Sequence, residues 1–230
     1  MHFSRASGSL VASMSSINQA MARGVTPLHI ACLKGHTEVA AMLCSKGAAI
    51  NQAADDGVTP LHVACVLGHL AAARTLSSYG AQRLPLDMEM ASSRGHAELA
   101  AWLTLSRQWT TPLHHLDTIT APRARALLRD GASIHAAVDH GGPTPLSLAR
   151  SMRAAGNAAD GSPAHLVLQV AAPWSPSTHE LFASGVRERA VVLLLLGAQL
   201  SNQERFFRQE DALKDLWLFH VMPLAVGGAP

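Results

Sequence analysis

Thirteen histidines and three cysteines are the side chains of this chain with the clearest potential for chemistry. Histidine and cysteine are the usual zinc ligands, and a structural zinc site needs four converging groups at characteristic spacings. The densest group is His114-His115 followed by Asp117, and no fourth ligand completes it. These three side chains are also the candidates to inspect if the chain were an enzyme. We therefore expect no metal and no cofactor.

The cysteines and the adjacent acids favour structural roles as well. Cys32, Cys44 and Cys65 show no CxxC spacing, and an odd, sparse count is typical of a reducing compartment. Small buried thiols are the favoured interpretation of Cys32 and Cys65. Asp55-Asp56 is interpreted as a solvated turn rather than a catalytic pair. Since no catalytic triad order, phosphate-binding loop or paired-carboxylate motif stands out, we predict no enzymatic activity.

A repeated hexapeptide sets the positions of most of the histidines. Residues 24–29, Gly-Val-Thr-Pro-Leu-His, return 33 positions later as residues 57–62. The residues that follow return too, because the Gly35-His36 pair has its counterpart in Gly68-His69. A fixed period indicates one supersecondary unit stacked many times.

Each part of this unit has a physical function. Thr26 can cap a helix by accepting a hydrogen bond from an unpaired backbone N–H. Pro27 then occupies the first helical position, where its missing N–H costs nothing. Gly35 can end the helix in a left-handed conformation, and a second helix is predicted from about Thr37 to Gly47. One such unit cannot bury its apolar face alone, so the units must stack.

The motif and its period resemble the ankyrin repeat. The resemblance implies an all-α solenoid of stacked helix-turn-helix units with short β-hairpin-like fingers, here with a helical C-terminal cap. In that family the motif histidines form hydrogen bonds between loops and neighbouring units, so a structural role is implied. The residues that match the structural motif are Thr26, Pro27, Leu28, His29, Gly35, Thr59, Pro60, Leu61, His62, Gly68, Gly95, Thr111, Pro112, Leu113 and His114.

The register divides the chain into a partial repeat, five repeats and a cap. Residues 1–20 are predicted to be a partial N-terminal repeat, and residues 173–230 a helical cap containing helices over 186–200 and 209–221. The five repeats fill residues 21–172, with boundaries at 21–53, 54–86, 87–109 (shortened), 110–142 and 143–172 (degenerate).

The third repeat is predicted to have lost the motif. Six residues are missing ahead of Gly95, where a finger should be, and Asp87-Met88-Glu89 occupies the place of the helix-start motif. We therefore expect the first helix of this repeat at residues 88–93, with a tight link in place of a finger.

Two interpretations of the N-terminus are open. No acidic residue precedes Glu38, a composition similar to a transit peptide. Residues 17–19 nevertheless match residues 50–52 at the 33-residue spacing, which favours a folded repeat. We expect a cytoplasmic protein, with a nuclear location and organelle targeting as alternatives. Whether the chain is a fragment of a longer array is also open.

Composition argues against a nucleic-acid partner, and hydropathy argues against a membrane span. Eighteen basic and 16 acidic side chains nearly balance, which argues against a nucleic-acid partner bound through bulk charge. The longest apolar run, residues 190–196, is far shorter than the ~20 residues that a membrane span needs. We therefore expect no nucleic acid, no membrane span and a monomeric protein.

The resemblance implies a protein partner bound in a concave groove formed by the fingers and the ends of the first helices. Apolar side chains at those helix ends should meet solvent, unless they pack under loops. The groove positions carried over from the family are Arg23, Val25, Leu33, Lys34, Asp55, Asp56, Val58, Val66, Leu67, Arg94 and His140. We place the binding surface at residues 22–67, where the motif is intact. An alternative is an adaptor that recruits cargo to a ubiquitin-ligase or signalling complex through the C-terminal helices.

Overall fold

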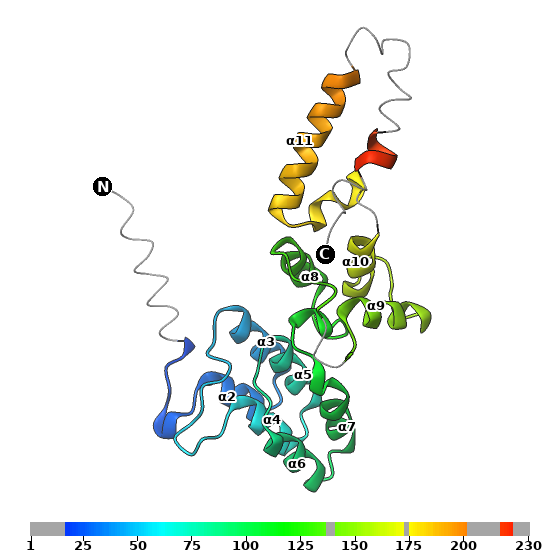
Figure 1. The fold of residues 1–230 in the computed structure, drawn as a ribbon. Coiled ribbons are helices and arrows are strands. Elements are labelled where there is room, and N and C mark those ends of the chain that lie inside the picture. Colours follow the sequence, from blue (N-terminus) through cyan, green and yellow to red (C-terminus); the bar gives the residue numbers. More distant parts are fainter. Residues whose placement is uncertain (1–16, 137–140, 173–174, 202–216, 223–230) are drawn as a thin grey trace, which may run out of the picture. The chain divides into compact units, whose positions relative to one another are not determined.

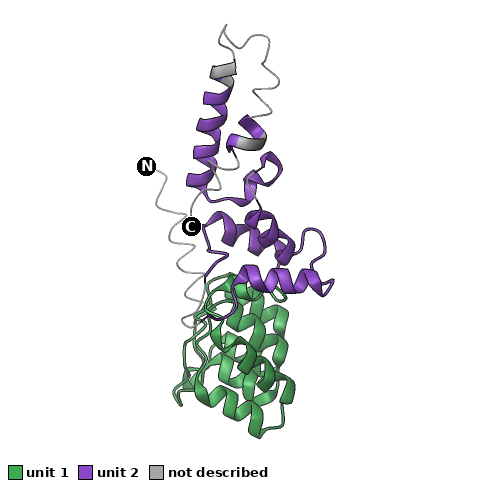
Figure 2. Ribbon diagram, turned by 45° about the vertical axis from the view of Figure 1, so that its right-hand side comes forward, with its two compact units in different colours: residues 1–118 green, residues 119–230 purple. Residues whose placement is uncertain are grey.

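The structure is a computed structural model of the chain, and it describes residues 17–136, 141–172, 175–201 and 217–222. Every regular element within these ranges is helical, and none is a β-strand. The chain divides into two compact units, unit 1 from Met1 to Thr118 and unit 2 from Ile119 to Pro230 (Figure 2). The boundary between the units falls inside the predicted fourth repeat.

Unit 1 is a stack of helical pairs (Figure 1). The first helices α2, α4 and α6 contact one another in series, and the second helices α3 and α5 also pack together. The elements of unit 1 are η1 (Ala22–Gly24), α2 (Pro27–Leu33), α3 (Thr37–Ser45), α4 (Pro60–Leu67), α5 (Leu70–Ser78), α6 (Pro85–Ser93), α7 (Ala97–Leu105), η2 (Ser106–Gln108) and η3 (Pro112–His114).

Capping residues determine where the first helix of each repeat begins and ends. The hydroxyl of Thr59 accepts a hydrogen bond from the His62 backbone N–H at 3.2 Å, and Pro60 fills the first position of α4. Gly68 ends α4 at a φ of 74°, a left-handed conformation that favours glycine. Buried small residues such as Ala64 and Cys65 let neighbouring helices approach closely, so the core of unit 1 is built from alanine, leucine and cysteine side chains.

The fingers are tight turns rather than paired strands. The Ala54 N–H donates to the Val58 carbonyl at 2.9 Å and closes one finger. The Asp55 N–H donates to the Arg23 carbonyl at 3.0 Å and so joins this finger to the one before it. The β-hairpin pairing expected for the fingers is not found in the described residues, because these single bonds make no ladder.

The third repeat keeps the helix-start motif in altered form, which corrects the sequence prediction. Helix α6 begins at Pro85 instead of residue 88, with proline again in the first helical position. Leu84 therefore takes the place of the threonine, and Asp87 takes the place of the histidine. The Asp87 carboxylate accepts a hydrogen bond from the Leu84 backbone N–H at 2.7 Å, which caps the helix without a threonine.

The fourth repeat starts with the motif but does not continue it as a helix. Thr111-Pro112-Leu113-His114 opens only the short 3₁₀ turn η3. Leu116 and Asp117 stand here at the positions that small buried residues occupy in α2 and α4. The charged Asp117 side chain is exposed and pairs with Arg74, so this segment cannot enter the helix stack as α2 and α4 do.

Unit 2 contains a group of three packed helices and one long helix. Helix α10 packs against both α9 and α8. Ser147 replaces the motif histidine at the start of α9, where its hydroxyl accepts a hydrogen bond from the Thr144 N–H at 2.9 Å. The elements of unit 2 are α8 (Ala121–Arg129), α9 (Pro145–Ala154), α10 (Pro163–Ala171), η4 (Pro176–Leu181), α11 (Ser184–Ser201) and the π-helical turn η6 (Trp217–Val221).

Three predictions lie partly or wholly outside the described residues. The partial repeat is described only from Ile17 onward, and the last predicted helix only over residues 217–221. His140 falls in the undescribed range 137–140. The capping role of the C-terminal segment stays a prediction.

Candidate functional site

The ends of the first helices present leucine to solvent. Leu33, the last residue of α2, is 49% exposed, and Leu67, the last residue of α4, is 39% exposed. Because α2 contacts α4, these two leucines belong to adjacent helices of one stack. The exposed Lys34 follows Leu33, whereas Val66 is half-buried. An exposed leucine is therefore repeated at the helix end of two successive repeats, and in the first of them a charged residue follows it.

The finger positions add charge of both signs to this surface. Arg23, Asp55 and Asp56 are exposed, and Val25 and Val58 are half-buried. Arg23 adopts a φ of 64°, which is uncommon for a residue with a side chain. The backbone bond from Asp55 to Arg23 brings the first two fingers together.

Arg94 is the last predicted contact residue whose position the structure describes, and it lies outside residues 22–67. Arg94 is exposed and follows α6 as its C-terminal cap. It belongs to the third repeat, where no finger accompanies the helix end. The structure thus joins Arg23 and Asp55 through their fingers, whereas Arg94 comes from the repeat that lacks one.

His29 joins two repeats through its two ring nitrogens. The Thr26 backbone N–H donates to Nδ1 at 3.1 Å, so this nitrogen carries no proton. The opposite nitrogen, Nε2, donates to the carbonyl of Val58 in the next repeat at 3.0 Å. Both ring nitrogens of the buried His29 are therefore used in structure, and neither is available for catalysis.

His62 repeats the position of His29 but has a different partner. Its Nδ1 donates to the Asp87 carboxylate at 2.9 Å. Asp87 is almost fully buried, and it also caps α6. The third repeat has no finger to supply a backbone carbonyl, so a side chain replaces it.

The histidines that follow the turn glycines connect repeats in a second way. His96 donates from Nε2 to the carbonyl of Val66 in the preceding repeat at 3.1 Å. Its ring lies against Gly68, where an added Cβ would be 2.4 Å from Nδ1 of His96. His69 lies against Gly35 in the same manner. The glycine is needed both for its left-handed φ and for the space that the next histidine occupies.

The stacked cysteines are buried thiols. Cys32 and Cys65 have no solvent exposure, and neither forms a disulfide. Burial raises the pKa of each thiol to about 12, because dehydration disfavours the thiolate. Since the thiolate is the nucleophile, these cysteines are unreactive in the folded chain.

We expect a maleimide probe at pH 8 to modify Cys32 and Cys65 only as fast as unit 1 opens. Intact-mass measurements over time would show this, and the urea-unfolded chain, which should react at once, is the control.

Because the folded pKa is raised, the stability contributed by these protonated thiols should be lost as the pH rises from about 9 towards 12. Modification at the same rate in folded and unfolded chains would contradict the burial of these thiols.

The His114-His115-Asp117 group does not converge on a common point. His114 is buried and accepts a hydrogen bond at Nδ1 from the Thr111 N–H at 3.2 Å. Asp117 is exposed and lies 3.5 Å from Arg74. In the described ranges, no group of three or more histidine, cysteine or acidic side chains is placed to hold a metal ion.

His115 belongs to an aromatic cluster that the sequence did not reveal. Its ring meets the edge of Trp109 at a centroid distance of 5.0 Å, and Trp102 lies 6.4 Å from Trp109. The guanidinium of Arg83 lies 5.1 Å from the centroid of the Trp102 ring. These residues follow no repeat period, and the only signal was the shortened link before Thr111.

Comparisons with known proteins agree with this repeat geometry. A family model described as "Ankyrin repeats (3 copies)" matches residues 6–84. No curated protein matches the chain. Among the described residues, no helix combines the length and the apolar character that crossing a membrane requires. The matched segment contains α2 to α5 with their caps and turn glycines. Residues 6–84 of this chain are therefore similar to ankyrin repeats.

Proposed function

We propose that the chain is a non-enzymatic interaction module that binds a protein partner through the repeat surface at residues 22–67. Ankyrin repeats are generally protein–protein interaction modules. In this surface the motif is intact, and the two successive fingers are joined by the hydrogen bond from Asp55 to Arg23. The repeat surface is thus most regular over these residues.

The exposure of Leu33 and Leu67 carries this proposal. Large apolar side chains that are exposed beside charged groups mark sites of protein interaction. Lys34 directly follows Leu33, and Asp55 and Asp56 lie on the intervening finger. A partner with apolar side chains and mixed charge would cover the two leucines and meet the charged rim.

We expect the double substitution Leu33→Glu with Leu67→Glu to weaken partner binding by about tenfold or more, because two central apolar contacts would become buried charges. Both positions are exposed, so the thermal unfolding midpoint should change little. The partner would first be identified by photo-crosslinking from a benzoylphenylalanine placed at position 33. Its affinity for each variant would then be measured by calorimetry with purified partner.

The matched control is Val39→Glu with Met42→Glu. These exposed apolar side chains lie on α3, the second helix of the same repeat. The control makes the same change in charge at exposed apolar positions but should leave the affinity unchanged. Equal loss in both variants, or no loss in the first, would reject the surface at residues 22–67.

A second candidate function is an adaptor role for α11. Val191, Val192, Leu195 and Leu196 of this helix are exposed, with Leu195 at 65%. An apolar strip of this kind could dock a further protein and so deliver the cargo of unit 1 to a larger complex. Val192→Glu with Leu195→Glu, included in the same experiment, should then remove crosslinked proteins other than the partner of residues 22–67.

A further inference from the structure

A second surface of unit 1 is formed where the fingers are shortened. The links after α5 and after α7 leave two adjacent hollows in place of projecting turns. One hollow, of about 280 Å³, is lined by Ser77, Gln82, Trp109 and His115 among others, and the second, of about 430 Å³, by apolar side chains. Arg83 and Arg107 line both hollows, so the two form a continuous site that we call the arginine pocket.

Arg83 is a cation held in place without an acidic partner. It donates from Nε to the Ser77 hydroxyl at 3.3 Å and from Nη1 to the Ser106 carbonyl and hydroxyl. Its Nη2 is 3.5 Å from Nε2 of His115, a long distance for a hydrogen bond. No carboxylate of the described residues forms an ion pair with Arg83. The guanidinium group of Arg83 is thus held in place by hydrogen bonds, while no acidic side chain of the described residues neutralises its charge.

The partial burial of this cation has an electrostatic cost. Burial lowers the pKa of Arg83, because dehydration disfavours its charged form. The guanidinium nevertheless stays charged at neutral pH, since arginine is not deprotonated in proteins. A negatively charged ligand would offset this cost, and Nη2, which makes only the long contact with His115 among the described residues, is the nitrogen of Arg83 placed to donate a charge-assisted hydrogen bond to it.

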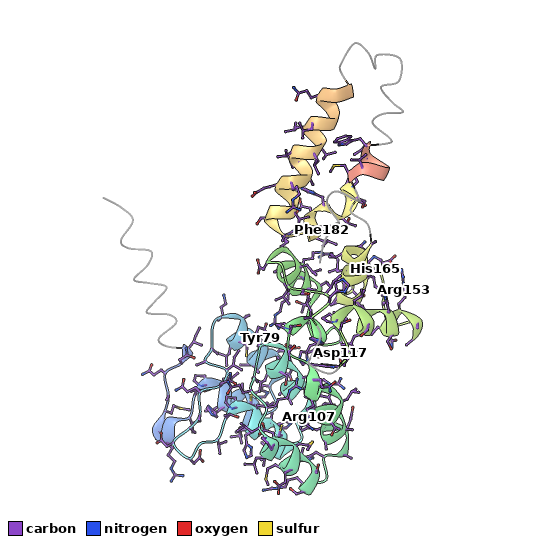
Figure 3. The ribbon with its side chains drawn as sticks, in the orientation of Figure 1. Tyr79, Arg107, Asp117, Arg153, His165 and Phe182 are labelled. Atoms are coloured by element: carbon purple, nitrogen blue, oxygen red, sulfur yellow. The ribbon has the colours of Figure 1, made fainter. Side chains whose placement is uncertain are left out.

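Arg107 and Trp109 line the polar hollow together with Arg83. The Arg107 side chain, labelled in Figure 3, is exposed in η2 and forms no hydrogen bond or ion pair with the described residues. The indole N–H of Trp109 is buried and has no acceptor among them. Two guanidinium groups and an indole therefore surround the polar hollow, and no acidic residue lines it.

The second hollow suits an apolar side chain. It is lined by Leu84, Pro85, Met88 and Leu103, and Leu84 and Met88 are both exposed. Since Arg83 and Arg107 line both hollows, a bound chain could place a carboxylate on the arginines and a neighbouring apolar group against Leu84. A nucleic acid would instead require a longer basic stripe than two arginines provide.

We propose that the arginine pocket binds an acidic peptide segment, in which a glutamate or aspartate carboxylate contacts Arg83 and Arg107 and a nearby apolar side chain fills the hollow beside Leu84 and Met88. This site is separate from the surface at residues 22–67. One chain with both sites holds two protein segments at once, or one partner at two points.

The test uses the full chain and four pools of fluorescein-labelled octapeptides. Each pool has one fixed leucine and, three residues later, a fixed glutamate, glutamine, phosphoserine or lysine, and the other positions are randomised. Fluorescence anisotropy should show the glutamate pool binding about tenfold or more tightly than the glutamine pool, because only the carboxylate forms charge-assisted bonds. In ¹⁵N spectra, the indole signal of Trp109, assigned with Trp109→Phe, should shift with the same affinity.

Matched charge reversals locate the site. Arg107→Glu should weaken binding of the glutamate pool by about tenfold or more, and Arg153→Glu, an equal charge change at an exposed position of α9, should leave it unchanged. The Leu33→Glu with Leu67→Glu variant should also bind the pool normally, so this proposal and the function proposed for residues 22–67 can fail separately. Equal binding of all pools, insensitivity to Arg107→Glu, or no shift of the Trp109 indole would overturn the proposal. Tighter binding of the phosphoserine pool would replace the carboxylate ligand with a phosphate.

Discussion

Replacing Gly68 with alanine is expected to lower the free energy of unfolding of unit 1 by about 3 kcal/mol. Two costs combine at this position. The φ of 74° is unfavourable for any residue with a Cβ, and the new Cβ would be 2.4 Å from Nδ1 of His96. The ring would have to move, and its hydrogen bond to the Val66 carbonyl would be lost. Urea unfolding followed by far-ultraviolet circular dichroism would measure the change.

Gly57 provides the matched control for this substitution. Its φ is 81°, and a Cβ added there would meet no atom within 4 Å. Gly57→Ala should therefore cost only about 1 kcal/mol, the backbone part of the effect. If the contact with His96 is responsible for the remainder, Gly68→Ala combined with His96→Ala should be less destabilising than the sum of the two single changes. Equal effects at Gly57 and Gly68 would show that the histidine is irrelevant.

Replacing Asp87 with alanine should have an effect of similar size, about 3 kcal/mol. The carboxylate is 1% exposed, and it accepts hydrogen bonds from the Leu84 N–H and from Nδ1 of His62. Its removal would leave a part-buried helix-start N–H and a largely buried ring nitrogen without their acceptor. Urea unfolding of the variant would give the loss in free energy.

Glu89→Ala is the control for the loss of a negative charge from α6, because Glu89 is exposed on the same helix. It should change the stability by less than about 0.5 kcal/mol. A cycle with His62→Ala should then show coupling between the two partners, with the double variant less destabilised than the sum. Strict additivity would mean that Asp87 acts only as the cap of α6.

The shortened link ahead of α6 explains both the role of Asp87 and the presence of the arginine pocket. Loss of the finger ahead of α6 removes the backbone carbonyl that a motif histidine would bind, and Asp87 supplies an acceptor from a side chain. It also removes the turn that would cover Arg83, and the hollow beside that residue is open. The helix stack continues from α4 to α6 across this shortened link, and the arginine pocket lies beside it.

The sequence by itself determined the register of the first repeats. It placed the starts of α2 and α4 at Pro27 and Pro60 and their ends near Gly35 and Gly68, as the structure has them. These signals are local, because a cap, a proline and a left-handed glycine act on the few residues beside them. The match of residues 6–84 to the ankyrin-repeat model covers α2 and α4, where these signals lie.

The tertiary structure decided what happens where the period fails. The sequence put the start of α6 three residues too late, because Leu84 conceals a motif whose cap is supplied by Asp87. It also gave no indication that Arg83 meets Trp102 and His115, which are 19 and 32 positions away. Such contacts depend on how a shortened link folds the chain back, and their energy comes from burial and charge rather than from local conformation. For this reason the helix stack could be predicted from the sequence, whereas the arginine pocket could be found only in the folded chain.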